Sequence, residues 1–412
     1  MQIQDIFVSK ILNSKKRPTI SVAIQFKGKR FESSAPEGTS KGIHEVQTFS
    51  SKGIDFSIHL LNAIGKKIVS DKINFETFQD LKKFEEIIKK FDATLNFSVI
   101  GGSAVYAFET ALLKAMAFSH EQEMWQFLMD KKSNTRIPLP LGKVIGGGMH
   151  VEQDLKTDFQ EFLIMPRTKN FSDAYSINLQ AYKEAKLLLK QKDKYWQETI
   201  DYENSLASTL DNESILDLLE QIKDKIKTKF GTTIELGIDI AASDLWNEKK
   251  YIYKNFKKNM QKAELDKKQQ LIYLHQLTKK YNLFYIEDPF QEDDFSAFSE
   301  FNKKTKALVC GDDLTCTSLD RLKKAIKMKS IKAIMIKPNQ RGSLIETKET
   351  IDFAKKNDII LVASHRSGDT CDNALAHFAL GWQIPIIKTG ILGKERFAKL
   401  NELLRIERKF KF

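Results

Sequence analysis

Six short runs of apolar and β-branched residues recur in the second half of the chain. A polar or charged residue ends or follows each run, and these residues are Asp239, Glu287, Asp312, Lys337, His365 and Lys388. The intervals between them are 48, 25, 25, 28 and 23 residues. An interval of about 25 residues accommodates one strand, one helix and their two turns. This spacing predicts serial β-α units with a parallel sheet.

Two earlier apolar runs, at residues 141–145 and 162–165, raise the number of expected strands to eight. This number favours a closed, TIM-like (β/α)8 barrel over an open sheet. An open nucleotide-binding sheet is expected to carry a glycine-rich phosphate loop after an early strand, and the sequence contains neither GxGxxG nor a Walker A pattern. We therefore predict an α/β barrel.

The first part of the chain has a different pattern. Apolar residues alternate with small or polar ones over residues 20–26, and Phe31 begins a second run after the turn residue Gly28, which predicts two strands. Residues 54–129 show helical periodicity. We expect a smaller α+β domain at residues 1–130, with a Gly/Ser/Pro-containing loop at 33–42, followed by the barrel at residues 131–412.

Lys and Arg number 66 against 54 Asp and Glu, which gives a formal charge of +12. Such an excess can indicate nucleic-acid binding. A large part of it lies in the lysine-rich residues 249–280, which we interpret as a solvated, amphipathic helical insertion. Nucleic-acid binding is therefore not the preferred hypothesis.

Composition also limits where the protein can work. The three cysteines form no CxxC pair, which suits a reducing compartment. No apolar run approaches the roughly 20 residues of a membrane span, and the first residues lack the pattern of a signal peptide. We expect a soluble, cytoplasmic protein.

In a parallel barrel, the carboxyl ends of all strands meet on one face. The carboxylates Asp239, Glu287 and Asp312 are hard oxygen ligands and predict one Mg²⁺ site there. Lys337 would lie between them and Lys388, and this second cation would lower its pKa and help it act as a base. A metal, a lysine base and an anion-binding group predict proton abstraction next to a carboxylate.

Several short segments then match one known family, in that family's order and spacing. They are IGGGMH at 145–150, QEF at 160–162, IEDPF at 286–290, GDDLT at 311–315, IKPNQRGS at 336–343, SHRSGDT at 364–370 and the segment 387–407. The chain resembles the enolases (phosphopyruvate hydratases) from near its N-terminus to near its C-terminus. The resemblance implies an enolase-type barrel and two Mg²⁺ ions per active site.

The resemblance also implies an activity and its residues. An enolase interconverts 2-phosphoglycerate and phosphoenolpyruvate in glycolysis and gluconeogenesis. Lys337 would be the base, and Glu203 the acid, with Glu161 beside it. The metal ligands would be Asp239, Glu287 and Asp312, with Ser40 of the mobile loop 33–42 at the second ion. The substrate contacts would be His150, Glu161, His365, Arg366, Ser367 and Lys388.

The resemblance further implies a small phosphorylated substrate and a homodimer or a higher homo-oligomer. Two other hypotheses stay open at this point. One is a catalytically weakened, enolase-like protein that binds RNA or protein, and the other is a different lyase or isomerase of the same superfamily. The segment 365–367 together with Lys388 suits a phosphorylated substrate and favours enolase itself.

One segment departs from the family pattern. Enolases usually carry DEGG around the acid, whereas this chain reads IDYENSLAS at residues 200–208. Asn204 and Ser205 replace both glycines, although glycine there suits a backbone conformation that other residues resist. We therefore expect either a displaced Glu203 or a rebuilt loop.

Overall fold

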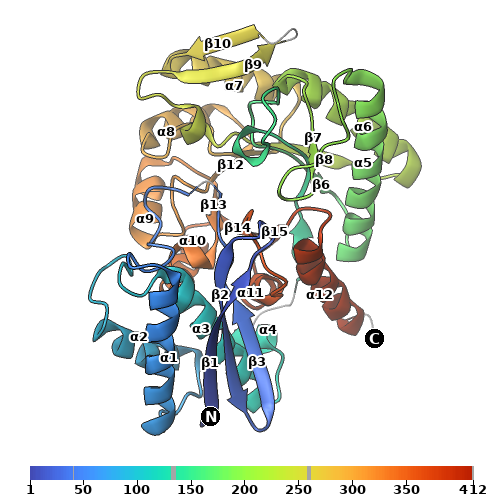
Figure 1. The fold of residues 1–412 in the computed structure, drawn as a ribbon. Coiled ribbons are helices and arrows are strands. Elements are labelled where there is room, and N and C mark those ends of the chain that lie inside the picture. The colour runs from blue at the N-terminus through green and yellow to red at the C-terminus, as the bar shows by residue number, and fades with distance from the viewer. Residues whose placement is uncertain (40, 131–135, 258–260, 411–412) are drawn as a thin grey trace.

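The computed structural model describes residues 1–39, 41–130, 136–257 and 261–410. It begins with three antiparallel strands, β1 (Asp5–Leu12), β2 (Pro18–Phe26) and β3 (Lys29–Ser34), in the order β1-β2-β3 (Figure 1). The two strands expected around residues 20–31 are confirmed as β2 and β3. The sequence analysis missed β1, which pairs with β2 over its whole length.

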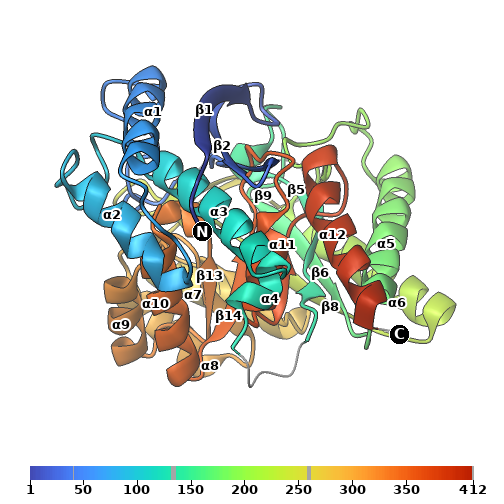
Figure 2. The ribbon, with the colours of Figure 1, turned by 90° about the horizontal axis from the view of Figure 1, so that it is seen from below.

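Four helices follow the small sheet. They are α1 (Ile54–Ser70), α2 (Leu81–Lys89), α3 (Gly102–Ser119) and α4 (Met124–Leu128). Helix α3 is almost entirely buried because it packs against β2 and β3 and also against α10 (Leu344–Lys356) of the second half (Figure 2). Apolar side chains on all its sides match this position between two layers.

The second half forms a ten-stranded sheet with the order β4-β15-β14-β13-β12-β11-β8-β6-β5-β7. The strands are β4 (Leu139–Pro140), β5 (Gly142–Gly146), β6 (Glu161–Pro166), β7 (Leu206–Ala207), β8 (Ile234–Asp239), β11 (Tyr285–Glu287), β12 (Leu308–Gly311), β13 (Ala333–Ile336), β14 (Ile360–Ser364) and β15 (Ile386–Lys388). Only Leu141 separates β4 from β5, and its N–H donates to the carbonyl of Ile387. Because β4 pairs with β15 and β5 with β6, this stretch closes the barrel.

The expectation of a uniformly parallel sheet is wrong at one strand. Strand β6 runs antiparallel to both of its neighbours, β5 and β8. The segment between β5 and β6 contains only a short 3-10 turn, Gly148–His150, and no crossover helix. Antiparallel strands can be joined by such a loop, whereas parallel strands need a longer crossover.

Helices cover the outside of the barrel, and side chains fill its interior. The outer helices are α5 (Phe171–Lys192), α6 (Asn212–Phe230), α7 (Lys267–Lys280), α8 (Phe295–Lys304), α9 (Leu319–Met328), α10, α11 (Ala374–Gly381) and α12 (Lys394–Phe410). Met335, Val362 and Cys310 belong to one buried cluster inside the barrel. Their neighbours Ile334 and Ile336 instead pack with the helices, as the alternation of a strand requires.

The lysine-rich segment 249–280 is only partly helical. Strands β9 (Tyr251–Lys257) and β10 (Gln261–Leu265) form a hairpin at the edge of the molecule, and α7 follows (Figure 1). Tyr251, Tyr253 and Asn255 are buried while Lys254 is exposed, which is the period of two that marks a strand. The expected helical insertion is therefore wrong for residues 251–257 and 261–265.

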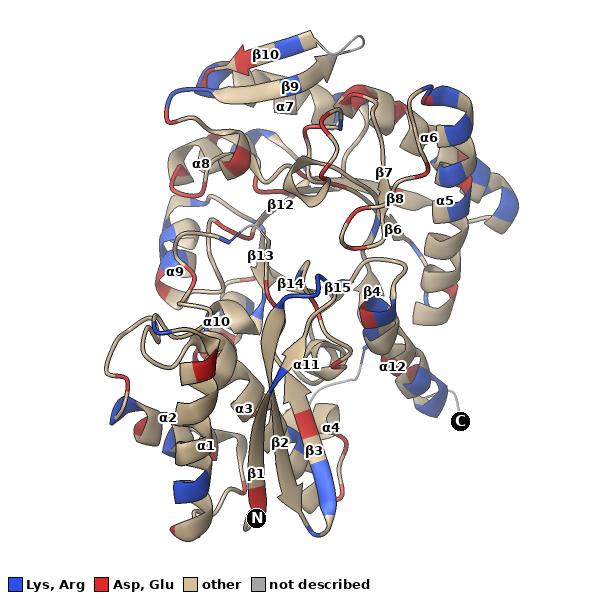
Figure 3. Cartoon of the chain, viewed as in Figure 1, with Lys and Arg blue, Asp and Glu red and all other residues tan. Residues whose placement is uncertain are grey.

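Lys and Arg are spread over the outer helices α5, α6, α9 and α12, with Asp and Glu among them (Figure 3). Among the described residues, no helix combines the length and the apolar character that a membrane crossing would need.

Candidate active site

The carboxyl ends of six barrel strands carry the polar or charged residues that the spacing predicted. Asp239, Glu287 and Lys388 are the last residues of β8, β11 and β15, and Glu287 is in register with Asp239. Asp312, Lys337 and His365 directly follow their strands. The strand ends surround a small cavity, which is lined by Gly38, His150, Gln160, Glu161, Glu203, Asp239, Lys337, Ser364, His365, Arg366, Ser367 and Lys388. The structure thus brings most of the predicted site residues together.

Lys388 lies among the acidic side chains. Its Nζ atom is 3.0 Å from Oδ2 of Asp239, 2.8 Å from Oε2 of Glu287 and 2.9 Å from Oε2 of Glu161. All four side chains are buried. Burial alone would lower the pKa of Lys388, but the negative charges around it outweigh burial and raise this pKa well above its usual value.

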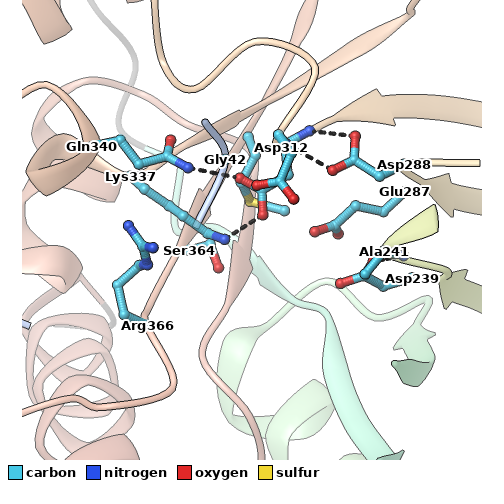
Figure 4. A network of polar contacts seen from close by, with 12 residues as sticks. Gly42, Asp239, Ala241, Glu287, Asp288, Asp312, Lys337, Gln340, Ser364 and Arg366 are labelled. Atoms are coloured by element: carbon cyan, nitrogen blue, oxygen red, sulfur yellow. Dashed lines mark hydrogen bonds and ion pairs between the residues drawn. The ribbon is translucent and has the colours of Figure 1, made fainter. Parts of the chain in front are cut away.

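Lys337 forms an ion pair with Asp312, whose other carboxylate oxygen accepts a hydrogen bond of 3.0 Å from Gln340 Nε2 (Figure 4). The sequence analysis expected a lowered pKa for Lys337, and this expectation is wrong for the structure described here. Burial, Arg366 and Lys388 lower this pKa, but the negative charge of Asp312 outweighs them and the net shift is upward.

The acidic residues fit a hard divalent cation. Within the described part of the chain, Oε1 of Glu287 is buried and has no hydrogen-bond partner. Burial, followed by the charge of Asp239, raises the pKa of Glu287 well above its usual value. A group of buried carboxylates with an unsatisfied oxygen is the donor set that Mg²⁺ prefers (Figure 4).

The loop expected to be mobile lies against the site. The N–H of Thr39 donates to Oγ of Ser367 over 2.7 Å, and Glu37 pairs through its backbone with Gly368. Ser40, the predicted ligand of a second ion, lies outside the described residues. Arg366 is held by a further loop residue, since Nη1 and Nη2 are each 2.9 Å from a carboxylate oxygen of Glu45.

Two carboxylates on another side of the cavity differ in acidity. Burial raises the pKa of Glu161 to about 7. Burial also opposes ionisation of Glu203, but the positive charge of Lys143 and the hydrogen-bonding contact of His365 outweigh it and lower the pKa of Glu203 well below its usual range. Nε2 of His365 lies 3.6 Å from Oε2 of Glu203, and burial lowers the pKa of His365 to about 4. Such separated acidities are typical of acid and base pairs.

The loop that departs from the family pattern is rebuilt, and it places Glu203 in the cavity. Asn204 has φ +64°, the left-handed conformation that glycine favours and that asparagine tolerates better than most residues. The Asp201 carboxylate accepts hydrogen bonds from the N–H groups of Glu203 and Ser205 at 2.8 and 2.9 Å. These bonds fix the turn without either glycine of the family pattern.

Sequence reasoning missed four residues that hold the site in place, namely Lys143, Asp201, Glu45 and Gln340. Lys143 carried the clearest signal, because it is a single lysine within the short apolar strand β5. A charge in a buried strand is rare unless it is paired. Its nearest ion-pair partners, Asp201 and Glu203, come from a segment about 60 residues further along the chain, so the sequence could not identify them.

Comparisons with known proteins agree with this geometry. Residues 3–128 match the family model described as "Enolase, N-terminal domain", and residues 134–411 match "Enolase, C-terminal TIM barrel domain". A curated "Enolase" of Methanosphaera stadtmanae is 37% identical over 410 residues, covering 98% of this chain and 96% of that protein. The "Enolase" proteins of Methanothermobacter thermautotrophicus and Archaeoglobus fulgidus are 34% and 33% identical over 98% and 99% of this chain, and the matches cover 96% and 97% of those proteins.

These matches extend over both halves of the molecule and include the strand ends that form the cavity. The chain belongs to the enolase family.

Proposed function

We propose that this protein is a Mg²⁺-dependent phosphopyruvate hydratase that interconverts 2-phosphoglycerate and phosphoenolpyruvate. One observation supports this most directly: a half-buried lysine, Lys337, and a buried carboxylate, Glu203, line the same cavity with two further carboxylates, Glu161 and Asp239. Abstraction of a proton next to a carboxylate and loss of a hydroxyl group require a base, an acid and a strong positive charge.

Lys337 is the proposed base for the proton at C2. In its ion pair with Asp312 it is protonated and cannot accept a proton. The expected ligands Asp239, Glu287 and Asp312 would hold the first Mg²⁺, and Ser40 would contribute to the second. When bound, the metal supplies positive charge that stabilises the negative charge developing on the substrate carboxylate. Engagement of Asp312 by a cation would release Lys337 for proton abstraction.

Glu203 is the proposed acid for departure of the C3 hydroxyl, with Glu161 beside it. Because the pKa of Glu203 lies well below its usual range, the proton that this pair holds near neutral pH is on Glu161, whose pKa is about 7, and Glu203 would receive it from there. His150 and His365 line the same cavity and are positioned to donate hydrogen bonds to the substrate.

Arg366, Ser367 and Lys388 are the proposed contacts for the phosphate and carboxylate groups of the substrate. The guanidinium of Arg366 presents paired donors that suit a phosphate. The contact of Thr39 with Ser367 supports closure of loop 33–42 over the substrate.

The family relationship supports three further proposals. The enzyme binds two Mg²⁺ ions per active site, acts in the cytoplasm in glycolysis and gluconeogenesis, and forms a homodimer or a higher homo-oligomer. Size-exclusion chromatography with light scattering would test the last of these, and a monomeric mass would contradict it.

The activity test follows the absorbance of phosphoenolpyruvate after addition of 2-phosphoglycerate to purified protein with Mg²⁺. The expected result is a turnover that requires Mg²⁺ and Lys337. Folded wild-type protein without measurable turnover would contradict the proposal. Salt-sensitive RNA binding by such an inactive protein would instead support the alternative of an enolase-like binding protein.

A further inference from the structure

A buried ammonium group lies beside the proposed acid, and the reaction as described above does not use it. Lys143 on β5 is only 1% exposed. Its Nζ atom lies 2.6 Å from Oδ2 of Asp201, 2.8 Å from Oε2 of Glu203 and 2.8 Å from Nδ1 of His150. Oε1 of Glu161 is further away, at 3.6 Å. One cation therefore contacts three side chains of the cavity wall at hydrogen-bond distance.

The chemistry of an ammonium group decides which atom donates and which accepts in the hydrogen bond between Lys143 and His150. A protonated lysine has three N–H donors and no acceptor. Nδ1 of His150 must therefore accept, which leaves the ring proton of a neutral His150 on Nε2. Burial lowers the pKa of His150 well below its usual value, so the ring is neutral. Burial opposes the charge on Lys143, but Asp201 and Glu203 outweigh it and raise the pKa of Lys143.

We propose that Lys143 is a positioning residue that fixes the Nε2–H tautomer of His150 and the orientation of the Glu203 carboxylate, with Asp201 as its anchor. The inference rests on the proposed function, because it assigns Glu203 and His150 to the reacting side of the cavity. It adds a residue that acts through these two and does not itself contact the substrate.

Asp201 makes the arrangement specific to this loop. One of its oxygens accepts the backbone N–H groups of Glu203 and Ser205, and the other contacts Lys143 and accepts a hydrogen bond from Oγ of Ser205. A Cβ atom on Gly146 would lie 2.1 Å from Oδ2 of Asp201, so only glycine leaves room for this carboxylate. The ion pair between Lys143 and Asp201 thus ties the turn that carries Glu203 to the barrel strand β5.

The same position could in principle suit a metal ion. The ligand atoms of His150, Asp201 and Glu203 all lie within 4.8 Å of one another. However, the ammonium group already lies within 2.8 Å of all three side chains, and a second cation there would meet its repulsion. The geometry therefore favours a lysine as the permanent cation of this site.

Nitrogen NMR of the Mg²⁺-loaded, ¹⁵N-histidine-labelled enzyme tests the tautomer directly. The His150→Gln variant assigns the signal, and the expected result for wild type at pH 8 is a protonated Nε2 and an unprotonated Nδ1. In Lys143→Met the signal should move toward a mixture of tautomers. A proton on Nδ1 in the wild type, or an unchanged His150 signal in Lys143→Met, would overturn the proposal.

Kinetics separate positioning from simple stability. Lys143→Met should lower kcat about 10²-fold, the size of effect that a displacement of about 1 Å produces, with KM changed less than about threefold. Lys143→Met leaves the buried carboxylate of Asp201 without its cation, which should lower the melting temperature. The double variant Lys143→Met/Asp201→Asn removes this unpaired charge. It should therefore restore the melting temperature of the wild type but not its kcat. Recovery of both would show a purely structural role and overturn the proposal.

A matched control is Lys114→Met, which removes a lysine from a different ion pair, 2.9 Å from Asp372. It should keep the kcat of the wild type. If wild type and control both lack turnover, the proposed lyase function fails, whereas the NMR result still decides the role of Lys143. The two failures are therefore distinguishable.

Discussion

The Nζ atom of Lys388 lies 2.8 Å from Oε2 of Glu287 and 3.0 Å from Oδ2 of Asp239, so one buried ammonium group faces two of the three expected Mg²⁺ ligands. This single charge does not compensate the acidic group, since Oε1 of Glu287 is buried and has no hydrogen-bond partner among the residues that the structure describes, and the pKa of Glu287 is raised. A divalent cation would relieve the remaining repulsion and would bind the folded state alone.

Mg²⁺ should therefore raise the melting temperature. At a concentration of about 100 times its Kd, a ligand stabilises by about 2.7 kcal/mol. Glu287→Gln should lose most of this shift, and Glu402→Gln, on the outer helix α12, should keep it. Thermal melts with Mg²⁺ or with a chelator measure the effect, and an equal Mg²⁺ shift in all three proteins would contradict the assignment of the ligands.

Lys337→Met should lower kcat about 10²- to 10⁴-fold, because a general base contributes about this factor. KM for 2-phosphoglycerate should change much less, since Arg366 and Ser367 are the proposed contacts for the phosphate. Steady-state kinetics at saturating Mg²⁺ measure both constants, and Lys114→Met is the matched control. A variant with more than a tenth of the wild-type kcat would rule out Lys337 as the base.

Variants at Asn204 test whether the rebuilt turn at residues 201–205 depends on the left-handed conformation of Asn204. At φ +64°, alanine has no favourable conformation, so Asn204→Ala should cost about 1 kcal/mol of stability. It should also lower kcat, because Glu203 precedes this residue directly. Asn204→Gly should stay within about 0.5 kcal/mol of the wild type, and urea unfolding compares the three. Equal stability of the alanine and glycine variants would show that φ does not control the turn.

Glu402 provides a pH test away from the active site. Burial opposes its ionisation, but His377 and Arg405 outweigh burial and lower its pKa to about 2. The unfolded chain has a value of about 4.3. The resulting stabilisation is therefore complete above pH of about 4.3 and is lost as the pH falls toward about 2.

The Glu402→Gln variant should be less stable than the wild type by about 1 kcal/mol at pH 7, since this pair is partly screened by solvent. The difference should shrink below pH of about 4.3. Thermal melts from pH 3 to pH 7 follow it. A difference that stays constant over this range would show that ionisation of Glu402 does not stabilise the fold.

The sequence by itself determined the barrel and the residues at its strand ends. The spacing of the apolar runs and the periodicity of apolar residues can be read directly from the sequence. The runs that end at Asp239, Glu287 and Lys388 form strands, as expected. The boundary between residues 1–130 and 131–412 stays a prediction. The antiparallel direction of β6 and the β9–β10 hairpin were not predicted, because a short apolar run does not reveal its direction and a lysine-rich segment hides its alternating tyrosines.

Only the tertiary structure decided the electrostatics of the site. The sequence placed Lys337 between opposite charges, but the sign of its pKa shift depends on its distances to Asp312, Arg366 and Lys388. The sequence likewise gave no reason to connect Lys143 with Asp201. A charge interaction is set by separation and burial in space, and folding brings together residues that are far apart in the chain.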